Sequence, residues 1–115
     1  ETEDKGSGYQ AALVRSMMEY LRKNYDGSIC LATLAKHFGL SKGHTCRLVK
    51  AMTHMTPFEY LNYYRINQSA YLLHNSDADI SQIAGMTGFN NISYYNRTFQ
   101  RYMHMTPSQF RKSLL

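Results

Sequence analysis

The 115 residues, 43% of them hydrophobic, suffice for one compact domain or two very small ones, and they exclude a large enzyme with a separate cofactor domain. No apolar run reaches the roughly 18 residues of a membrane span, and the N-terminus lacks the features of a secretory signal. The formal net charge is +5, and residues 80–115 contain no Asp or Glu beside four Lys or Arg, which favours a polyanionic partner.

The first part of the chain predicts a linker followed by a helix. Residues 1–8, ETEDKGSG, show no apolar periodicity, and the chain begins without Met, so we expect a disordered linker or cloning remnant there. Residues 9–24 carry apolar side chains at helical spacing, and Asp26-Gly27 is a turn signal after them. The apolar positions are Leu13, Val14, Met17 and Leu21.

The next segment predicts two helices joined by a tight turn. Residues 31–38, LATLAKHF, place apolar residues on one helical face, and Gly39 is suited to a left-handed cap. Ser41 can cap a second helix over 42–52. Together with the preceding helix, these elements form an N-terminal helix-turn-helix unit over 9–56.

A long helix and a second copy of the same pattern follow. Residues 57–75 begin with Pro57, which is suited to a helix start, and form a linker helix. Residues 76–115 form the C-terminal unit, in which Gly88 ends one helix and Asn90 or Asn91 caps another that runs to about Tyr102.

The two units are copies of one repeat. HMTP occurs at 54–57 and again at 104–107, and the surrounding residues match at an offset of 49 before the turn and 50 after it. One extra residue therefore lies near Asn90 or Asn91 in the second copy. In a helix-turn-helix unit the second helix can enter a DNA major groove, although glycine-linked helix pairs are also common in proteins that bind no DNA.

Residues 29–112 resemble the DNA-binding domain of AraC/XylS-type bacterial transcription regulators. The match is most specific in ISQIAGMTGFNNISYYNRTFQRYMHMTPSQFRK, which contains I-A-x-x-x-G-F and the closing P-x-x-[YF]-R. The resemblance implies an all-α fold of about seven helices, homeodomain-like, with two helix-turn-helix units joined by a long linker helix. It also implies that each HMTP segment closes one unit, with its Met packed inward and its Pro starting the next helix.

Two equivalent arginines are the first candidates for reading bases. Arg47 and Arg97 hold the same place in the two second helices, and arginine can form two hydrogen bonds with guanine, although either residue can instead contact phosphate alone. The resemblance extends the candidate base contacts to Gly43, Cys46, Arg47, Ile92, Ser93, Tyr94, Asn96 and Arg97. Helix side alone indicates phosphate contacts at Lys42, Lys50, Gln100 and Arg101.

The first reading helix departs from the family pattern at two positions. Gly43 offers no side chain and costs a helix about 1 kcal/mol relative to Ala. Thr45 stands where the family usually has an apolar core residue. We therefore expect the first unit to discriminate less between sequences than the second. A linker helix counted from about 57 to 74, 18 residues or roughly 27 Å, would bring the two reading helices to about one DNA turn apart.

The sequence gives no support for catalysis, a metal or a cofactor. It has no Gly-rich phosphate loop, and none of its five histidines pairs with another at i, i+3 or i+4 spacing. Cys30 and Cys46 are expected to be reduced thiols, and a redox role for Cys46 lacks a nearby resolving cysteine. We expect no enzyme activity.

The prediction is sequence-specific binding of double-stranded DNA by a cytoplasmic bacterial transcription regulator, an activator by resemblance. The helices around 42–52 and 91–102 would read two adjacent major grooves. The alternative is a basic helical protein-interaction module without DNA sequence specificity. The resemblance further implies RNA polymerase as a partner and an effector and dimerisation domain outside this chain, with no membrane partner.

Overall fold

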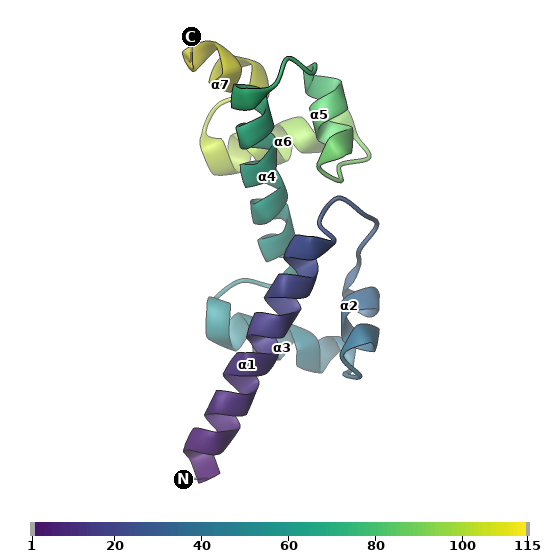
Figure 1. The fold of residues 1–115 in the computed structure, drawn as a ribbon, viewed down its shortest axis with the longest axis vertical. Coiled ribbons are helices and arrows are strands. Elements are labelled where there is room, and N and C mark those ends of the chain that lie inside the picture. The colour runs from purple at the N-terminus through teal and green to yellow at the C-terminus, as the bar shows by residue number, and fades with distance from the viewer. Residues whose placement is uncertain (1, 115) are drawn as a thin grey trace. The chain divides into compact units, whose positions relative to one another are not determined.

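The computed structural model describes the backbone of residues 2–114 and the side chains of residues 8–114. It contains seven helices and, over that range, no strand (Figure 1). The expected all-α fold class is confirmed. The helices are α1 (Thr2–Lys23), α2 (Leu31–His37), α3 (Lys42–Thr53), α4 (Pro57–Asn75), α5 (Ile80–Met86), α6 (Ile92–Met103) and α7 (Pro107–Ser113).

The start of α1 differs from the sequence expectation. Its first turns lie in the segment 1–8, where the composition predicts a disordered linker. That segment contains no proline, so its backbone can extend the helix specified by the apolar residues of 9–24. Glu1 lies outside the described residues.

The chain divides into two compact units. Unit 1 comprises Glu1–Asn24 and Ile29–Leu61, and unit 2 comprises Tyr25–Ser28 and Asn62–Leu115. The division falls inside α4, so the first turn of that helix belongs to unit 1 and the rest to unit 2. The short loop after α1 also belongs to unit 2.

The core of unit 1 joins α1, α2 and α3. Met17, Leu34 and Val49, one from each helix, are at most 1% exposed. After α2, Gly39 takes a φ of 69°, a left-handed conformation in which a Cβ is unfavourable, and the Leu40 N–H donates to the Ala35 carbonyl at 2.9 Å. The turn thereby closes α2 and directs the chain into α3.

Unit 2 repeats this arrangement with a more aromatic core. Gly88 takes a φ of 94° after α5, and the Phe89 N–H donates to the Ala84 carbonyl at 2.9 Å. The Asn91 side chain accepts the Tyr94 N–H at 2.9 Å and so begins α6, which identifies Asn91 as the cap. The buried core comprises Ile66, Leu73, Ile83, Ala84, Phe89, Tyr95 and Phe99.

The repeated HMTP segments end one helix and begin the next. His54 and His104 are left-handed C-caps with φ of 63°, and each donates its N–H to the helix that it ends. Thr106 then begins α7 through a capping box with Gln109, while Pro107 occupies the first turn. The repeat is therefore a structural device, as the resemblance implies, and its histidines are cap residues.

Candidate nucleic-acid interface

α3 has a buried face and an exposed face. Thr45, Leu48 and Val49 are at most 7% exposed and hold the helix to unit 1. The predicted contact residues of this helix are Lys42, Gly43, Cys46, Arg47 and Lys50. All of them are exposed except Cys46, which is half-buried. The exposed face is thus the one predicted to meet DNA.

α6 shows the same division. Tyr95, Thr98 and Phe99 are at most 5% exposed and hold the helix to unit 2. The predicted contact residues are Ile92, Ser93, Tyr94, Asn96, Arg97, Gln100 and Arg101. Tyr94 and Asn96 are half-buried and the others are exposed. Ile92 is 42% exposed, so its methyl groups are accessible for the predicted contact with a thymine methyl group.

Arg47 and Arg97 occupy equivalent places in their units. Both are exposed. Arg47 lies between the buried residues Thr45 and Leu48, and Arg97 lies between Tyr95 and Thr98, which are buried at the same positions of the repeat. α3 carries three Lys or Arg residues and α6 carries two, and neither helix contains Asp or Glu. Neither helix therefore presents a carboxylate of its own that would repel a phosphate.

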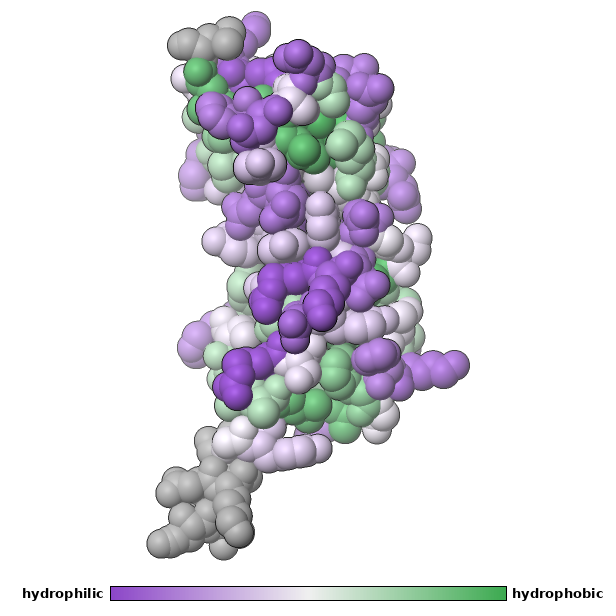
Figure 2. Space-filling view, viewed as in Figure 1, coloured by the Kyte–Doolittle hydropathy of each residue, from purple (hydrophilic) through white to green (hydrophobic). Residues whose placement is uncertain are grey.

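Hydrophilic side chains and apolar patches are interspersed on the face of the molecule that Figure 2 shows. Among the described residues, no helix is both long and apolar enough to span a bilayer.

Tyr94 differs from the other predicted base contacts. Its hydroxyl accepts a hydrogen bond from Asn62 Nδ2 on α4 at 2.7 Å, and its ring lies 6.0 Å from that of Phe89. Asn62 is only 6% exposed. The phenolic oxygen of Tyr94 is thus already engaged within unit 2.

Thr45 is accommodated without an unpaired hydroxyl. It is fully buried, and its Oγ1 donates to the Ser41 carbonyl at 2.8 Å. The hydroxyl group of Thr45, which stands in place of an apolar side chain, is therefore not left unsatisfied in the core.

Met52 is 39% exposed, although its helical spacing predicts an inward position. It lies near the end of α3, beside an open groove lined mainly by α1, and its side chain is therefore only partly covered.

Tyr95 anchors α6 from the opposite side. It is fully buried, with its ring 5.1 Å from Phe89 and 5.9 Å from Phe99. Burial raises the pKa of the Tyr95 phenol above its ordinary value, against the opposing influence of Ser69 and Arg111. The residue stays uncharged at neutral pH and serves packing.

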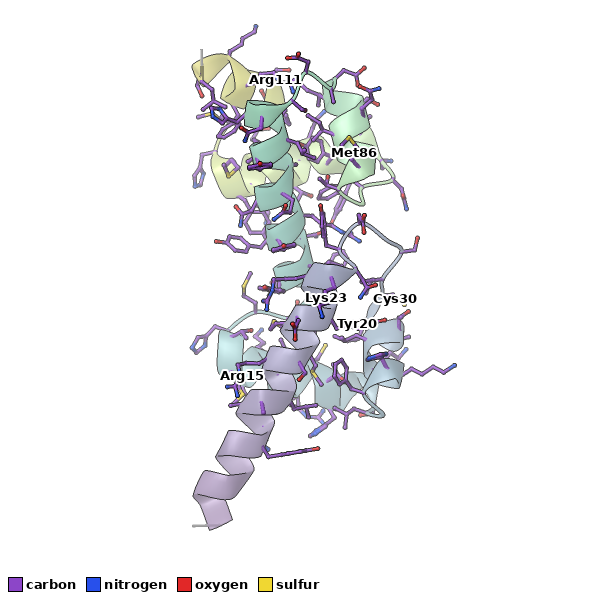
Figure 3. All side chains as sticks on the ribbon, viewed as in Figure 1. Arg15, Tyr20, Lys23, Cys30, Met86 and Arg111 are labelled. Atoms are coloured by element: carbon purple, nitrogen blue, oxygen red, sulfur yellow. The ribbon has the colours of Figure 1, made fainter. Side chains whose placement is uncertain are left out.

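Arg65 and Arg111 lie outside the predicted contact set, and both hold backbone carbonyls of unit 2. Arg65 is 7% exposed and donates to the carbonyls of Tyr25 and Gly27 at 2.6 and 2.8 Å. Arg111 donates to the carbonyls of Leu73 and Ser76, both at 3.1 Å, and lies beside the end of α4 (Figure 3). Arg65 thus satisfies carbonyls of the loop after α1, whereas Arg111 satisfies one carbonyl in the last turn of α4 and one just after it.

His44 is an exposed residue on α3 that the predicted contact set omits. It lies fifty positions before Tyr94, at the same register of the repeat, and its N–H donates to Ser41 Oγ at 3.1 Å. Applying the offset of fifty to every predicted contact would have found it. His44 lies on α3 three residues before Arg47, and both are exposed.

The described residues contain no group of three His, Cys, Asp or Glu able to hold a metal ion. Cys30 and Cys46 are free thiols. A hydrogen bond with Thr33 lowers the pKa of the Cys30 thiol, which is exposed.

Comparison with known proteins identifies the class. A helix-turn-helix domain family matches residues 34–113. The uncharacterized HTH-type transcriptional regulator YdeC of Bacillus subtilis is 31% identical over 109 residues, which cover 95% of this chain and 38% of YdeC. The chain belongs to this helix-turn-helix family, and the resemblance to AraC/XylS-type regulators is confirmed.

Solved structures agree in fold. The C-terminal domain of AraT, a response regulator from Geobacillus stearothermophilus, superimposes with a TM-score of 0.84 at 24% identity, over 87% of this chain and 84% of that domain. The DNA-binding domain of AdpA, solved in complex with a target DNA, gives 0.83 at 22% identity, over 87% and 90% of the two chains. The chain spans little more than a third of the length of YdeC.

Proposed function

We propose that this chain is the sequence-specific DNA-binding part of a bacterial transcription regulator, in which α3 and α6 read adjacent major grooves of one duplex. The observation that carries the proposal is the pair Arg47 and Arg97. Both arginines are exposed and occupy equivalent positions of the repeat. The helices that carry them contain no Asp or Glu, and the opposite face of each helix is buried.

Each predicted contact has a chemical role in this proposal. Arg47 and Arg97 bind guanine, Asn96 binds adenine, and Ile92 meets a thymine methyl group. Cys46, Ser93 and the edge of Tyr94 complete the contacts with bases, and Gly43 brings the backbone of α3 close to them. Phosphate contacts come from Lys42, Lys50, Gln100 and Arg101.

The proposal extends to the regulator as a whole through family resemblance. It acts in the cytoplasm as an activator, contacts RNA polymerase, and receives its signal through an effector and dimerisation domain elsewhere in the protein. No enzyme activity and no metal or cofactor is part of the proposal.

Selection of binding sites from a random duplex pool tests the proposal. We expect two short sequence blocks about one helical turn apart. Arg47→Ala should remove the preference in one block and Arg97→Ala in the other. Arg15→Ala, which changes an exposed arginine on α1, should keep both blocks.

A selection that enriches no sequence would overturn the proposal. If no sequence is enriched, and selected and scrambled duplexes bind equally with the same salt dependence, the chain does not read DNA sequence. The basic faces of α3 and α6 would then serve a different, sequence-independent contact.

A further inference from the structure

The guanidinium of Arg47 lies over Gly43. Arg47 Nη1 is 3.2 Å from the point that a Cβ on Gly43 would occupy, and Arg47 Cζ is 4.0 Å from it. The side chain therefore runs back along α3 toward its first turn, as long helical side chains tend to do. A glycine at the position four residues earlier leaves this space open.

The second unit fills the corresponding space. Fifty positions later, Ser93 precedes Arg97 by four residues, so a side chain stands where the first unit has none. Both arginines are exposed, and both helices are held by three buried residues at matching positions. The two reading faces are otherwise similar, so they differ locally in the residue four positions before the arginine, which is Gly43 in α3 and Ser93 in α6.

This difference bears on how each arginine meets a base. An arginine that can rest against its own helix must leave that resting place to form two hydrogen bonds with guanine. A side chain four residues earlier occupies the resting place and keeps the guanidinium extended. Holding a contact group in its bound position before binding increases affinity and discrimination, because less conformational entropy is lost.

We propose that Gly43 is a positioning residue that gives Arg47 two placements, one folded over α3 and one extended into the groove, and so relaxes sequence preference in the half of the site read by α3. This inference rests on the proposed DNA-reading function. In this inference Gly43 does not contact a base directly but affects base reading through the placement of Arg47.

Gly43→Ser, which copies Ser93, tests the inference. Affinities are measured for the selected duplex and for one substituted at the base pair whose preference Arg47→Ala removes. We expect the ratio of the two affinities to rise by about three- to tenfold in Gly43→Ser, within the discrimination that one bidentate arginine supplies. The reciprocal change Ser93→Gly should lower the corresponding ratio for Arg97.

A double-mutant cycle separates positioning from helix stabilisation. Replacing glycine also favours the helix, but that effect does not depend on Arg47 and does not favour one base over another. In the Arg47→Ala background, Gly43→Ser should leave the affinity ratio unchanged. A ratio that rises equally with and without Arg47, or that does not rise in Gly43→Ser, overturns the inference.

The outcome for wild-type protein distinguishes this inference from the proposed function. If wild type selects two sequence blocks and Gly43→Ser leaves the first unchanged, only the role of Gly43 fails. If wild type selects no sequence at all, the DNA-reading function fails with it.

Discussion

Arg65 Nε donates to the backbone carbonyl of Tyr25 at 2.6 Å, across forty positions of sequence. The same guanidinium donates through Nη2 to the Gly27 carbonyl, and its Cζ lies 5.9 Å from the centre of the Phe89 ring. Burial lowers the pKa of the Arg65 guanidinium, which stays charged at neutral pH. One buried cation thus ties the loop after α1 to the core of unit 2.

Replacing Arg65 should destabilise the protein. In Arg65→Met the two carbonyls lose charged donors, and we expect the free energy of unfolding to fall by about 2–4 kcal/mol. Arg65→Lys keeps the charge but lacks the planar fork, so it should restore only part of the loss. Urea denaturation measures both, with the exposed Arg15→Met as the control. Equal stability of Arg65→Met and Arg15→Met would show that the hydrogen bonds from Arg65 to Tyr25 and Gly27 do not stabilise the protein.

Comparing Gly88→Ala with Gly39→Ala separates the cost of a steric contact from the cost of a positive φ. Both have positive φ, so Ala is unfavourable at either, by about 1–2 kcal/mol. A Cβ at Gly88 would also stand 2.6 Å from the Tyr25 carbonyl oxygen and 2.7 Å from Arg65 Nε, whereas Gly39 has nothing within 4 Å. Gly88→Ala should therefore cost at least about 1–3 kcal/mol more than Gly39→Ala in urea denaturation. Equal losses would contradict the close approach.

Tyr94→Phe separates the structural role of the phenolic oxygen from base reading. The substitution leaves Asn62 Nδ2 buried without its acceptor, which should lower the free energy of unfolding by about 1–3 kcal/mol. The bases selected by α6 should not change. Tyr71→Phe, at a residue 63% exposed, is the control for loss of a hydroxyl group. A changed base preference in Tyr94→Phe, with unchanged stability, would instead assign the oxygen to DNA.

The sequence predicted the helices and, apart from the start of α1, their approximate ends because the relevant interactions are local. Gly39, Ser41 and Gly88 act within a few residues of their own positions, through backbone conformation and caps. Burial on α3 and α6 follows the helical period, apart from Met52 near the end of α3, where the groove on α1 leaves its side chain partly uncovered.

The long-range polar contacts were not predictable in the same way. Arg65 looks like an ordinary surface cation in the sequence. Arg111 stands in the closing P-x-x-[YF]-R motif, but the motif does not indicate its partners, because backbone carbonyls carry no residue-specific signal. The Asn62–Tyr94 hydrogen bond likewise joins residues 32 positions apart. The repeat does contain one unused signal, because the offset of fifty pairs His44 with Tyr94.

Buried tyrosine should limit stability at alkaline pH. Burial raises the pKa of Tyr95 above 10.0, so above that pH the unfolded chain releases a proton that the folded chain still holds. Stability contributed by this group is complete below about pH 10 and falls as pH rises through the folded-state pKa. Tyr95→Phe should therefore reduce the fall in thermal midpoint between about pH 9 and 11. An identical slope in both proteins would show that other groups cause it.

The charge of Arg101 should appear in the salt dependence of DNA binding. Each cation that neutralises one phosphate adds about 0.9 to the slope of log K against log salt. Arg101→Ala should lower that slope by about 1, with affinity falling equally for selected and scrambled duplexes. Gln100→Ala removes a neighbouring exposed residue that carries no charge, so its slope should match wild type. If Arg101→Ala alters the selected sequence while its slope stays at the wild-type value, the residue reads a base, and the assignment of phosphate contacts by helix side is wrong.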